Sequence, residues 1–463
     1  MSIAVQRPRA VAQFALLAGP LLSMIDSSIV NVATPSIMAS LHVPVGDAQW
    51  VASAYLLALG IGLSLTPWLS GRFGGAHVYA GCILAFAVAS GLCSLSWSLP
   101  VLVGARVLQG LVAGPMVPLA MGALMGEDAG GRRAGMAAGF ALFAAPAFGP
   151  VLGGLLLHAG GWPLIFLVNV PIGAAAWWAC RRVPRGVFAT ARRRRMDPIG
   201  FALLALGMTG VVVAGQRGPV DGWASAYTLL PLTVGLAALV AYVRHAARSR
   251  HPLVDLRALG SPVAVTAVAI SGLATVIAFA TVFLVPAFLQ QVQRMDAFAT
   301  GLVLLPAGVL TALGSVAGDA LAARSLRATV AGGLVALAAS SLLLGGLDAS
   351  TPVWQPLLVL GARGAAIGLV TGPLVTALTR LSPAALRDDT NTGFTIGLRV
   401  ASSLGIAVLA TGYGAASTPT AGLHAVGVVM TVAAAAGLPG CLLLPRRGRA
   451  TRPGAEGGDP PRG

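Results

Sequence analysis

Charged residues are scarce in this sequence, making up only 10% of its 463 residues, whereas 56% are hydrophobic. Soluble domains carry about 25% charged residues, so this balance excludes a soluble globular protein. The HExxH and GxSxG patterns are also absent, and acids or histidines do not cluster within the apolar stretches. Metal-dependent and nucleophilic hydrolysis depend on such groups, so we expect no enzyme activity, no metal and no cofactor.

Lysine is missing altogether, so the net charge of +16 comes from 30 arginines against 14 acidic residues. Cysteine is rare, and its four positions have no metal-binding or redox spacing, which predicts small packing residues. These cysteines are Cys82, Cys93, Cys180 and Cys441.

Long apolar windows are what the chain has in abundance, and each is long enough to cross a bilayer as a helix. We predict fourteen spans: 12–38, 48–69, 77–97, 99–122, 134–156, 163–183, 198–216, 225–244, 262–286, 299–321, 328–347, 354–379, 392–412 and 422–444. The predicted fold class is therefore an all-α polytopic membrane protein.

The arginines test this count through the positive-inside rule. With the N-terminus in the cytoplasm, 25 of the 30 arginines fall in the two tails and in alternate loops, all on the cytoplasmic side. The distribution predicts fourteen spans with both termini cytoplasmic. It favours orientation signals in contact with anionic lipid over a nucleic-acid partner.

An internal repeat relates 104-GARVLQGLVAGPMV-117 to 361-GARGAAIGLVTGPLV-375. Many transporters are built by duplication of a helical unit, although small helix-packing residues alone give part of this similarity. We predict four regions: an N-terminal six-helix bundle (1–184), an arginine-rich loop with two inserted spans and a following loop (185–257), a C-terminal six-helix bundle (258–445) and a disordered basic tail (446–463).

Several ordered motifs carry a family resemblance across nearly the whole chain. The stretch 26-DSSIVNVATP-35 resembles a D-x-T-I-V-N-V-A-L-P signature, and 149-GPVLGG-154 resembles the G-P-x-x-G-G antiporter motif. Further matches are 50-WVASAYLLA-58, 106-RVLQG-110, 162-WPLIFLVNVPIG-173, 252-PLVDLR-257 and 301-GLVLLPAG-308. The chain thus resembles the fourteen-span drug:proton antiporter branch of the major facilitator superfamily. The resemblance implies two six-helix bundles plus two extra helices in a bacterial plasma membrane, with transport driven by the proton gradient.

The cytoplasmic gate loop departs from the family pattern. The family usually reads G-x-L-a-D-R-x-G-R-R between spans 2 and 3, where this chain has 69-LSGRFGGAHV-78. Arg72 and Gly74 remain, but Gly71 stands where the acid usually is. The second-half counterpart has Ala323 at the aligned acid position. Because these loops help to hold the cytoplasmic side shut, we expect a weaker closure.

Asp26 and Arg106 are the predicted proton-coupling residues. Asp26 is the only acid well inside a predicted span, and ionisable residues within a membrane are usually functional. A carboxyl group hidden from water favours its neutral form, whereas wetting favours proton release. Arg106 lies about 12 Å into span 4 at 1.5 Å per residue, and the resemblance implies that spans 1 and 4 are close together. Static neutralisation of charge, or a structural hydrogen-bonding role for Asp26, is the alternative.

Four further residues are substrate-cavity candidates. Gln109 lies one turn after Arg106 and shares its helix face. Asn31 either lines the same cavity or bonds across helices. Arg363 is the repeat counterpart of Arg106, with a structural role favoured, and Arg399 is a buried anchor or a cavity residue.

The antiporter motif supplies Gly149, Pro150, Gly153 and Gly154. Its small residues and prolines allow close approach and a kink in span 5. The kinked helix is predicted to seal the protein against leak while the halves rock, with ordinary tight packing as the alternative.

Together these features predict a proton-coupled antiporter that exports small lipophilic drugs or toxic compounds by alternating access. A single buried acid favours monovalent cationic or neutral substrates. We expect a monomer in the lipid bilayer whose partners are protons and its substrate. A dedicated exporter of one self-made metabolite or antibiotic is the alternative, and a channel or non-transporting scaffold is a third class.

Overall fold

The computed structural model describes residues 10–124, 148–149, 151–183, 185–188, 195–249, 251–255, 257, 260–382, 387–414 and 416–445. These residues form helices and connecting turns, with no strand among them. An all-helical fold follows from the composition, because a helix satisfies every backbone hydrogen bond within its own segment inside lipid. The tail 446–463, the arginine run 192–194 and residues 125–147 lie outside the described part.

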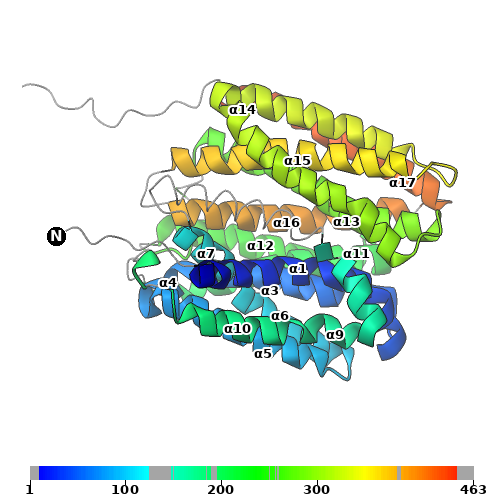
Figure 1. Cartoon of the computed structure of the whole chain (residues 1–463). Helices are drawn as coiled ribbons and strands as arrows, with labels where there is room; N and C mark the ends of the chain where they lie inside the picture. The colour runs from blue at the N-terminus through cyan, green and yellow to red at the C-terminus, as the bar shows by residue number, and fades with distance from the viewer. Residues whose placement is uncertain are drawn as a thin grey trace, which may run out of the picture.

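The first bundle contains the helices before residue 181 (Figure 1). They are α1 (Ala10–Leu41), α2 (Val45–Ala48), α3 (Trp50–Ser64), α4 (Thr66–Phe73), α5 (Gly75–Ser94), α6 (Leu99–Ala113), α7 (Met116–Leu124), α9 (Trp162–Leu167) and α10 (Asn169–Cys180). A further apolar helix covers Val151–Gly160. Buried residues of α1, α3, α5, α6, α7 and α10 share the core of this bundle.

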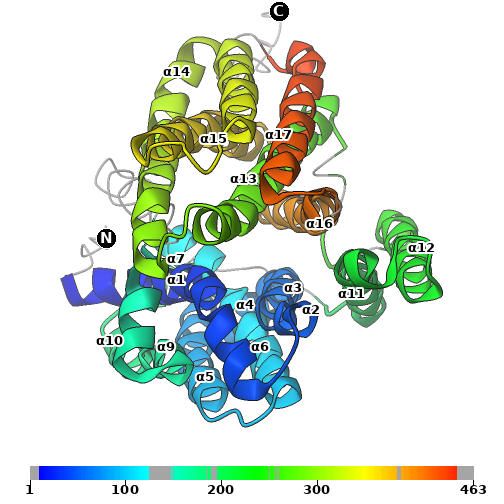
Figure 2. The same cartoon turned by 90° about the vertical axis from the view of Figure 1, so that its right-hand side faces the viewer.

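The second bundle forms the upper layer in Figure 2, and two inserted helices stand to one side. The bundle comprises α13 (Pro262–Gln291), α14 (Ala297–Gly345), α15 (Trp354–Leu381), α16 (Arg387–Gly414), α17 (Pro419–Ala436) and the 3-10 helix η4 (Pro439–Leu443). The inserted pair is α11 (Pro198–Asp221) and α12 (Ala226–Arg248), preceded by the 3-10 turn η1 (Arg185–Val187). α11 packs on α12 and also contacts α3 and α16, so it touches one helix of each bundle.

The helices compare closely with the predicted spans. Ten described helices are long and apolar enough to cross a membrane, or eleven if α3 and α4, bent by 52° about Leu65, form one span. α14 covers the two predicted spans 299–321 and 328–347 and is broken by non-helical backbone at Ser325. The predicted span 134–156 lies largely outside the described residues. Fourteen spans and cytoplasmic termini therefore stay predictions.

Glycines set how closely α3 and α6 approach each other. A Cβ atom at Gly110 would lie 2.3 Å from the carbonyl oxygen of Tyr55, and one at Gly62 would lie 2.1 Å from that of Leu111. Contacts this short with backbone cannot be relieved by a side-chain rotation. Close approach through small residues is how membrane helices associate in the absence of a hydrophobic driving force. Here it fixes the position of α6, which carries Arg106.

We therefore expect Gly110→Ala to destabilise the protein by about 1–3 kcal/mol, because the new methyl group must push two backbones apart. The measurement is the thermal unfolding midpoint of the purified protein in detergent. Gly104→Ala is the matched control, since a Cβ there meets no atom within 4 Å and the residue is in the same helix. Alanine favours a helix over glycine, so the control should unfold at the same or a slightly higher temperature. Equal midpoints for the two variants would contradict the packing argument.

Candidate functional site

Asp26 lies in the middle of α1 and is buried, with 1% of its surface exposed. Its carboxylate forms a salt bridge with Arg106 of α6, which is fully buried. A charged side chain inside a membrane protein is costly unless an opposite charge or hydrogen bonds compensate it. The structure thus brings together the two residues that the sequence predicted as a pair.

Amide side chains surround the carboxylate. Oδ1 of Asp26 accepts hydrogen bonds from Nδ2 of Asn169 at 3.0 Å and from Nε2 of Gln109 at 3.2 Å. Gln109 also accepts a bond from Arg106 at 2.7 Å and donates one to Ser90 at 2.6 Å. Four helices, α1, α5, α6 and α10, therefore meet in one buried polar network. Such networks are stable only when nearly every member finds a partner.

Arg106 is held by further contacts on its other side. Nε donates to the carbonyl oxygen of Val51 at 2.9 Å, and the guanidinium carbon lies 4.0 Å from the centre of the Tyr55 ring. The Tyr55 hydroxyl bonds to Ser23 of α1, one turn before Asp26. A cation over an aromatic face is attracted by the ring quadrupole, more strongly when both are desolvated. Tyr55 thus links the arginine to the helix that carries the acid.

One donor of this arginine has no partner. Nη2 of Arg106 is buried and makes no hydrogen bond with a described residue. An unsatisfied donor on a charged group costs more free energy than one on a neutral group. The pair is therefore shielded from water, but one donor of the arginine is unsatisfied. Separating the pair costs less free energy than it would if every donor of Arg106 were bonded.

The remaining cavity candidates fall in different places. Gln109 is fully buried within the network, so it does not face an open cavity in this conformation. Asn31 is exposed and makes no hydrogen bond with a described residue, so of its two alternatives the bond across helices is not seen in this conformation. The side chain of Arg399 lies outside the described residues.

Arg363 is buried within the second bundle as Arg106 is within the first, but no described acid pairs with it. It is buried and donates to Oγ1 of Thr281 at 2.7 Å, Oγ of Ser341 at 2.9 Å and the carbonyl oxygen of Ile277 at 3.4 Å. A contact with Met430 Sδ at 2.9 Å completes its surroundings. No described carboxylate forms an ion pair with it. Neutral acceptors alone hold this charge, which fits the structural role that the sequence favoured.

The sequence did not predict two members of the network: Asn169, which donates to Asp26, and Ser90, which accepts from Gln109 and Asn169. Asn169 lies in the quoted motif 162-WPLIFLVNVPIG-173, where a lone asparagine in an apolar run was a usable signal. Ser90 gave no signal, because serine packs in any membrane helix. Asp389 is a further buried acid, near the start of α16. The predicted span 392–412 begins three residues after it, so the sequence did not identify it as an acid within the membrane.

The antiporter motif packs directly against α1 beside the site. A Cβ at Gly149 would lie 1.8 Å from Oγ of Ser28, and one at Gly153 would lie 3.0 Å from Cγ1 of Ile29. A Cβ at Gly154 would lie 3.8 Å from Phe298 of α14, so this residue of the motif faces the second bundle. Pro150 lies outside the described residues. The motif therefore separates α1 from the other bundle two to three residues after Asp26.

The gate loop, 69–78, shows no ion pair among its described residues that could hold the cytoplasmic side shut. Gly74 has a φ of 83° between α4 and α5, a left-handed conformation that glycine adopts readily. Arg72 is exposed next to Gly71 and stacks on Phe73 at 5.6 Å, without an ion pair to a described acid. In the second half, Arg327 bonds instead to the carbonyl oxygens of Leu442 and Leu444.

Comparison with known proteins supplies a family. A sequence model of the Major Facilitator Superfamily matches residues 16–407. The chain is 32% identical over 303 residues to the multidrug export protein EmrB of Escherichia coli K12. The aligned region covers 65% of this chain and 59% of EmrB. The chain is also 31% identical over 408 residues to a tetracenomycin C resistance and export protein of Streptomyces glaucescens, with 85% and 74% covered. The match thus spans about three fifths of EmrB.

Solved structures agree on the fold. The inward-open xylose transporter XylE of E. coli superimposes with a TM-score of 0.63 at 15% identity, over 94% of this chain and 96% of that one. A peptide transporter POT in complex with sulfate gives 0.65 at 18% identity, over 96% and 97%. At these identities the likeness extends to the fold alone.

The buried pair leads to a double-mutant cycle. Asp26→Asn leaves Arg106 charged and buried, because a guanidinium cannot release its proton, and we expect a loss of about 3–5 kcal/mol. The double variant Asp26→Asn/Arg106→Gln removes both charges and should be more stable than Asp26→Asn alone. Unfolding midpoints in detergent measure each corner of the cycle. Additive losses from the two changes would mean that the ion pair contributes no coupling energy.

Proposed function

We propose, since this chain belongs to the Major Facilitator Superfamily, that it is a proton-coupled antiporter exporting lipophilic compounds across the bacterial plasma membrane. Family and fold are those of transporters rather than enzymes, and the many apolar helices are those of a multi-pass membrane protein. Multidrug and antibiotic export proteins among the relatives support the direction and the class of substrate.

The observation that carries the proposal is the buried salt bridge between Asp26 and Arg106. Protonation of Asp26 removes the negative charge and leaves a buried guanidinium without its counterion. That state is unfavourable unless water or a new partner reaches the arginine. Proton binding therefore favours a conformation in which α1 and α6 separate at this point and the site becomes wet.

Alternating access follows from that preference. Asp26 takes up a proton when the cavity opens outward and releases it inside, where substrate replaces it and the pair re-forms. Each proton moving inward gains about 2.3 kcal/mol per 100 mV, plus the contribution of the pH gradient. The change is transmitted along α1, which contacts α3, α6, α7, α9 and α10 of its own bundle.

The substrate class is set by the charge of this centre. The ion pair is neutral as a whole, and Gln109 and Asn169 around it are uncharged. Neutral or monovalent cationic lipophilic compounds suit such a site, since a dication would need a second carboxylate. The multidrug relatives favour a broad range of compounds over one self-made metabolite. We propose that the protein functions as a monomer, because each site is complete within one chain.

The first test is dye export from proteoliposomes with an imposed pH gradient. We expect Asp26→Asn to abolish pH-driven export, because asparagine cannot exchange a proton, while substrate binding is retained. Asp221→Asn is the matched control, since Asp221 ends α11 and pairs with Arg217 at 3.4 Å away from the site. A protonophore should stop export by the wild type and by this control. Undiminished pH-driven export by Asp26→Asn would remove the carboxyl group from the mechanism.

A second test addresses the glycine contact with α1. Gly149→Ala places a methyl group against Ser28, and accommodation by shifted helices costs about 1–3 kcal/mol, so we expect export to fall roughly tenfold. Gly154→Ala, whose Cβ would be in ordinary contact with Phe298, should retain export. Transport rates are normalised to reconstituted protein. Comparable activity of both variants would show that close approach at Gly149 is not required for the cycle.

A further inference from the structure

α12 is the most lipid-exposed of the candidate spans. Only 22% of its most apolar window is buried inside the protein, the lowest value among them. It packs mainly on α11 and stands at the edge of the molecule in Figure 2. Val240 and Val243 are each 52% exposed on its surface. In a bilayer these side chains lie against hydrocarbon, so the occupant of this face is lipid.

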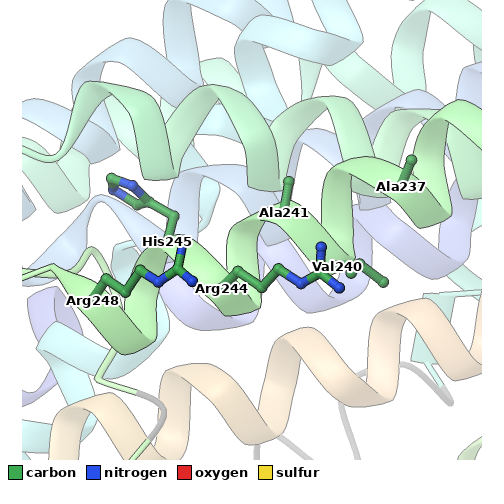
Figure 3. Close-up of a pocket in the computed structure, with 6 residues that line it drawn as sticks. All are labelled: Ala237, Val240, Ala241, Arg244, His245 and Arg248. Carbon is green, nitrogen blue, oxygen red and sulfur yellow. The ribbon is translucent and has the colours of Figure 1, made fainter.

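The C-terminal part of this helix carries a groove of about 490 Å³. Ala237, Val240 and Ala241 line its apolar end, and Arg244, His245 and Arg248 line the other (Figure 3). In Figure 3 the two arginines extend along one side of α12, whereas His245 turns to the other side. The groove thus joins an apolar floor to a pair of guanidinium groups.

Neither Arg244 nor Arg248 forms an ion pair within the part of the chain that the structure describes. Both are exposed. Asp197, the cap of α11, is instead bonded to His245 at 2.8 Å and to the amides of Gly200 and Leu253. Asp255 lines a neighbouring hollow together with Arg248, but it forms no ion pair with that arginine and accepts the amide of Arg257 instead. Like charges four residues apart on a helix repel each other, so this pair favours an external anion.

The spacing matches a phospholipid at the membrane surface. α12 has 23 residues, or about 35 Å at 1.5 Å per residue, and slightly exceeds a hydrocarbon core of about 30 Å. Its last turn therefore reaches the headgroup region. Arg244 and Arg248 are about 6 Å apart along the axis, within a headgroup layer roughly that thick. Ala237 lies about 10 Å deeper, at the level of the acyl chains.

We propose that this groove binds an anionic phospholipid of the cytoplasmic leaflet. The phosphate accepts hydrogen bonds from Arg244 and Arg248, a geometry that the planar guanidinium favours, and an acyl chain covers Ala237, Val240 and Ala241. The leaflet follows from the proposed orientation of the chain, whereas the site itself is independent of proton coupling. Lipid binding here would hold α12, and through it the His245–Asp197 contact with α11, beside α3 and α16.

The test uses the full-length protein in nanodiscs with equal amounts of phosphatidylglycerol and phosphatidylcholine. Native mass spectrometry counts each lipid retained after delipidation, and a photo-crosslinking phosphatidylglycerol analogue locates it. We expect wild type to retain phosphatidylglycerol preferentially, with crosslinks within 237–248. The double variant Arg244→Gln/Arg248→Gln should lower that preference by roughly fivefold per arginine, the ratio that about 1 kcal/mol corresponds to.

Arg324→Gln is the matched control, because Arg324 is exposed, lies on the same predicted side and is outside the groove. This variant should keep the full preference, and all three proteins should share one melting temperature. No preference in the wild type, crosslinks elsewhere, or an equal loss in the control would each overturn the proposal. The lipid preference and crosslink positions of the wild type are measured without any variant. These two results therefore test the proposal even if the double variant misfolds. Dye export by Asp26→Asn is a separate readout, so failure of one proposal does not imply failure of the other.

Discussion

The structure depends on a single electrostatic constraint, namely that a charge buried between membrane helices needs a compensating partner. Asp26 and Arg106 meet this constraint jointly, and the four helices α1, α5, α6 and α10 are arranged around them. Removing either charge leaves the other uncompensated. Only the carboxylate can lose its charge reversibly, by taking up a proton, because the guanidinium stays protonated. The asymmetry makes the acid the variable element and the arginine the fixed one.

The second bundle holds Arg363, the predicted repeat counterpart of Arg106, and no described acid pairs with it. Arg363 is satisfied by Thr281, Ser341 and a backbone carbonyl, all of which are neutral and none of which titrates. No proton can weaken these bonds within a physiological range. Under the proposed mechanism, the first bundle responds to protons and the second provides a rigid support. The proposed mechanism therefore assigns coupling to the first bundle alone.

The sequence predicted the helical class, most span positions and the pairing of Asp26 with Arg106, because each rests on a strong local signal. Apolar length identifies a span, and an ion in such a span needs a counterion. Asn169 and Ser90 were not predicted as partners, since small polar side chains occur throughout membrane helices and only three-dimensional contact distinguishes them. The sequence also predicted an interruption between spans 299–321 and 328–347, and the non-helical backbone at Ser325 lies within it.

Directional hydrogen bonds and close glycine contacts together hold α1 in place. On one side its polar groups are tied to α3, α6 and α10 through directional hydrogen bonds, which break when the helix shifts. On the other side the side chains of Ser28 and Ile29 lie against Gly149 and Gly153, in the space that the missing side chains of these glycines leave open. Side chains seated against glycines allow the two helices to approach closely, and this packing must yield when α1 shifts. The directional bonds and this packing determine the position of α1, and in the proposed mechanism proton binding at Asp26 releases the strongest of these bonds.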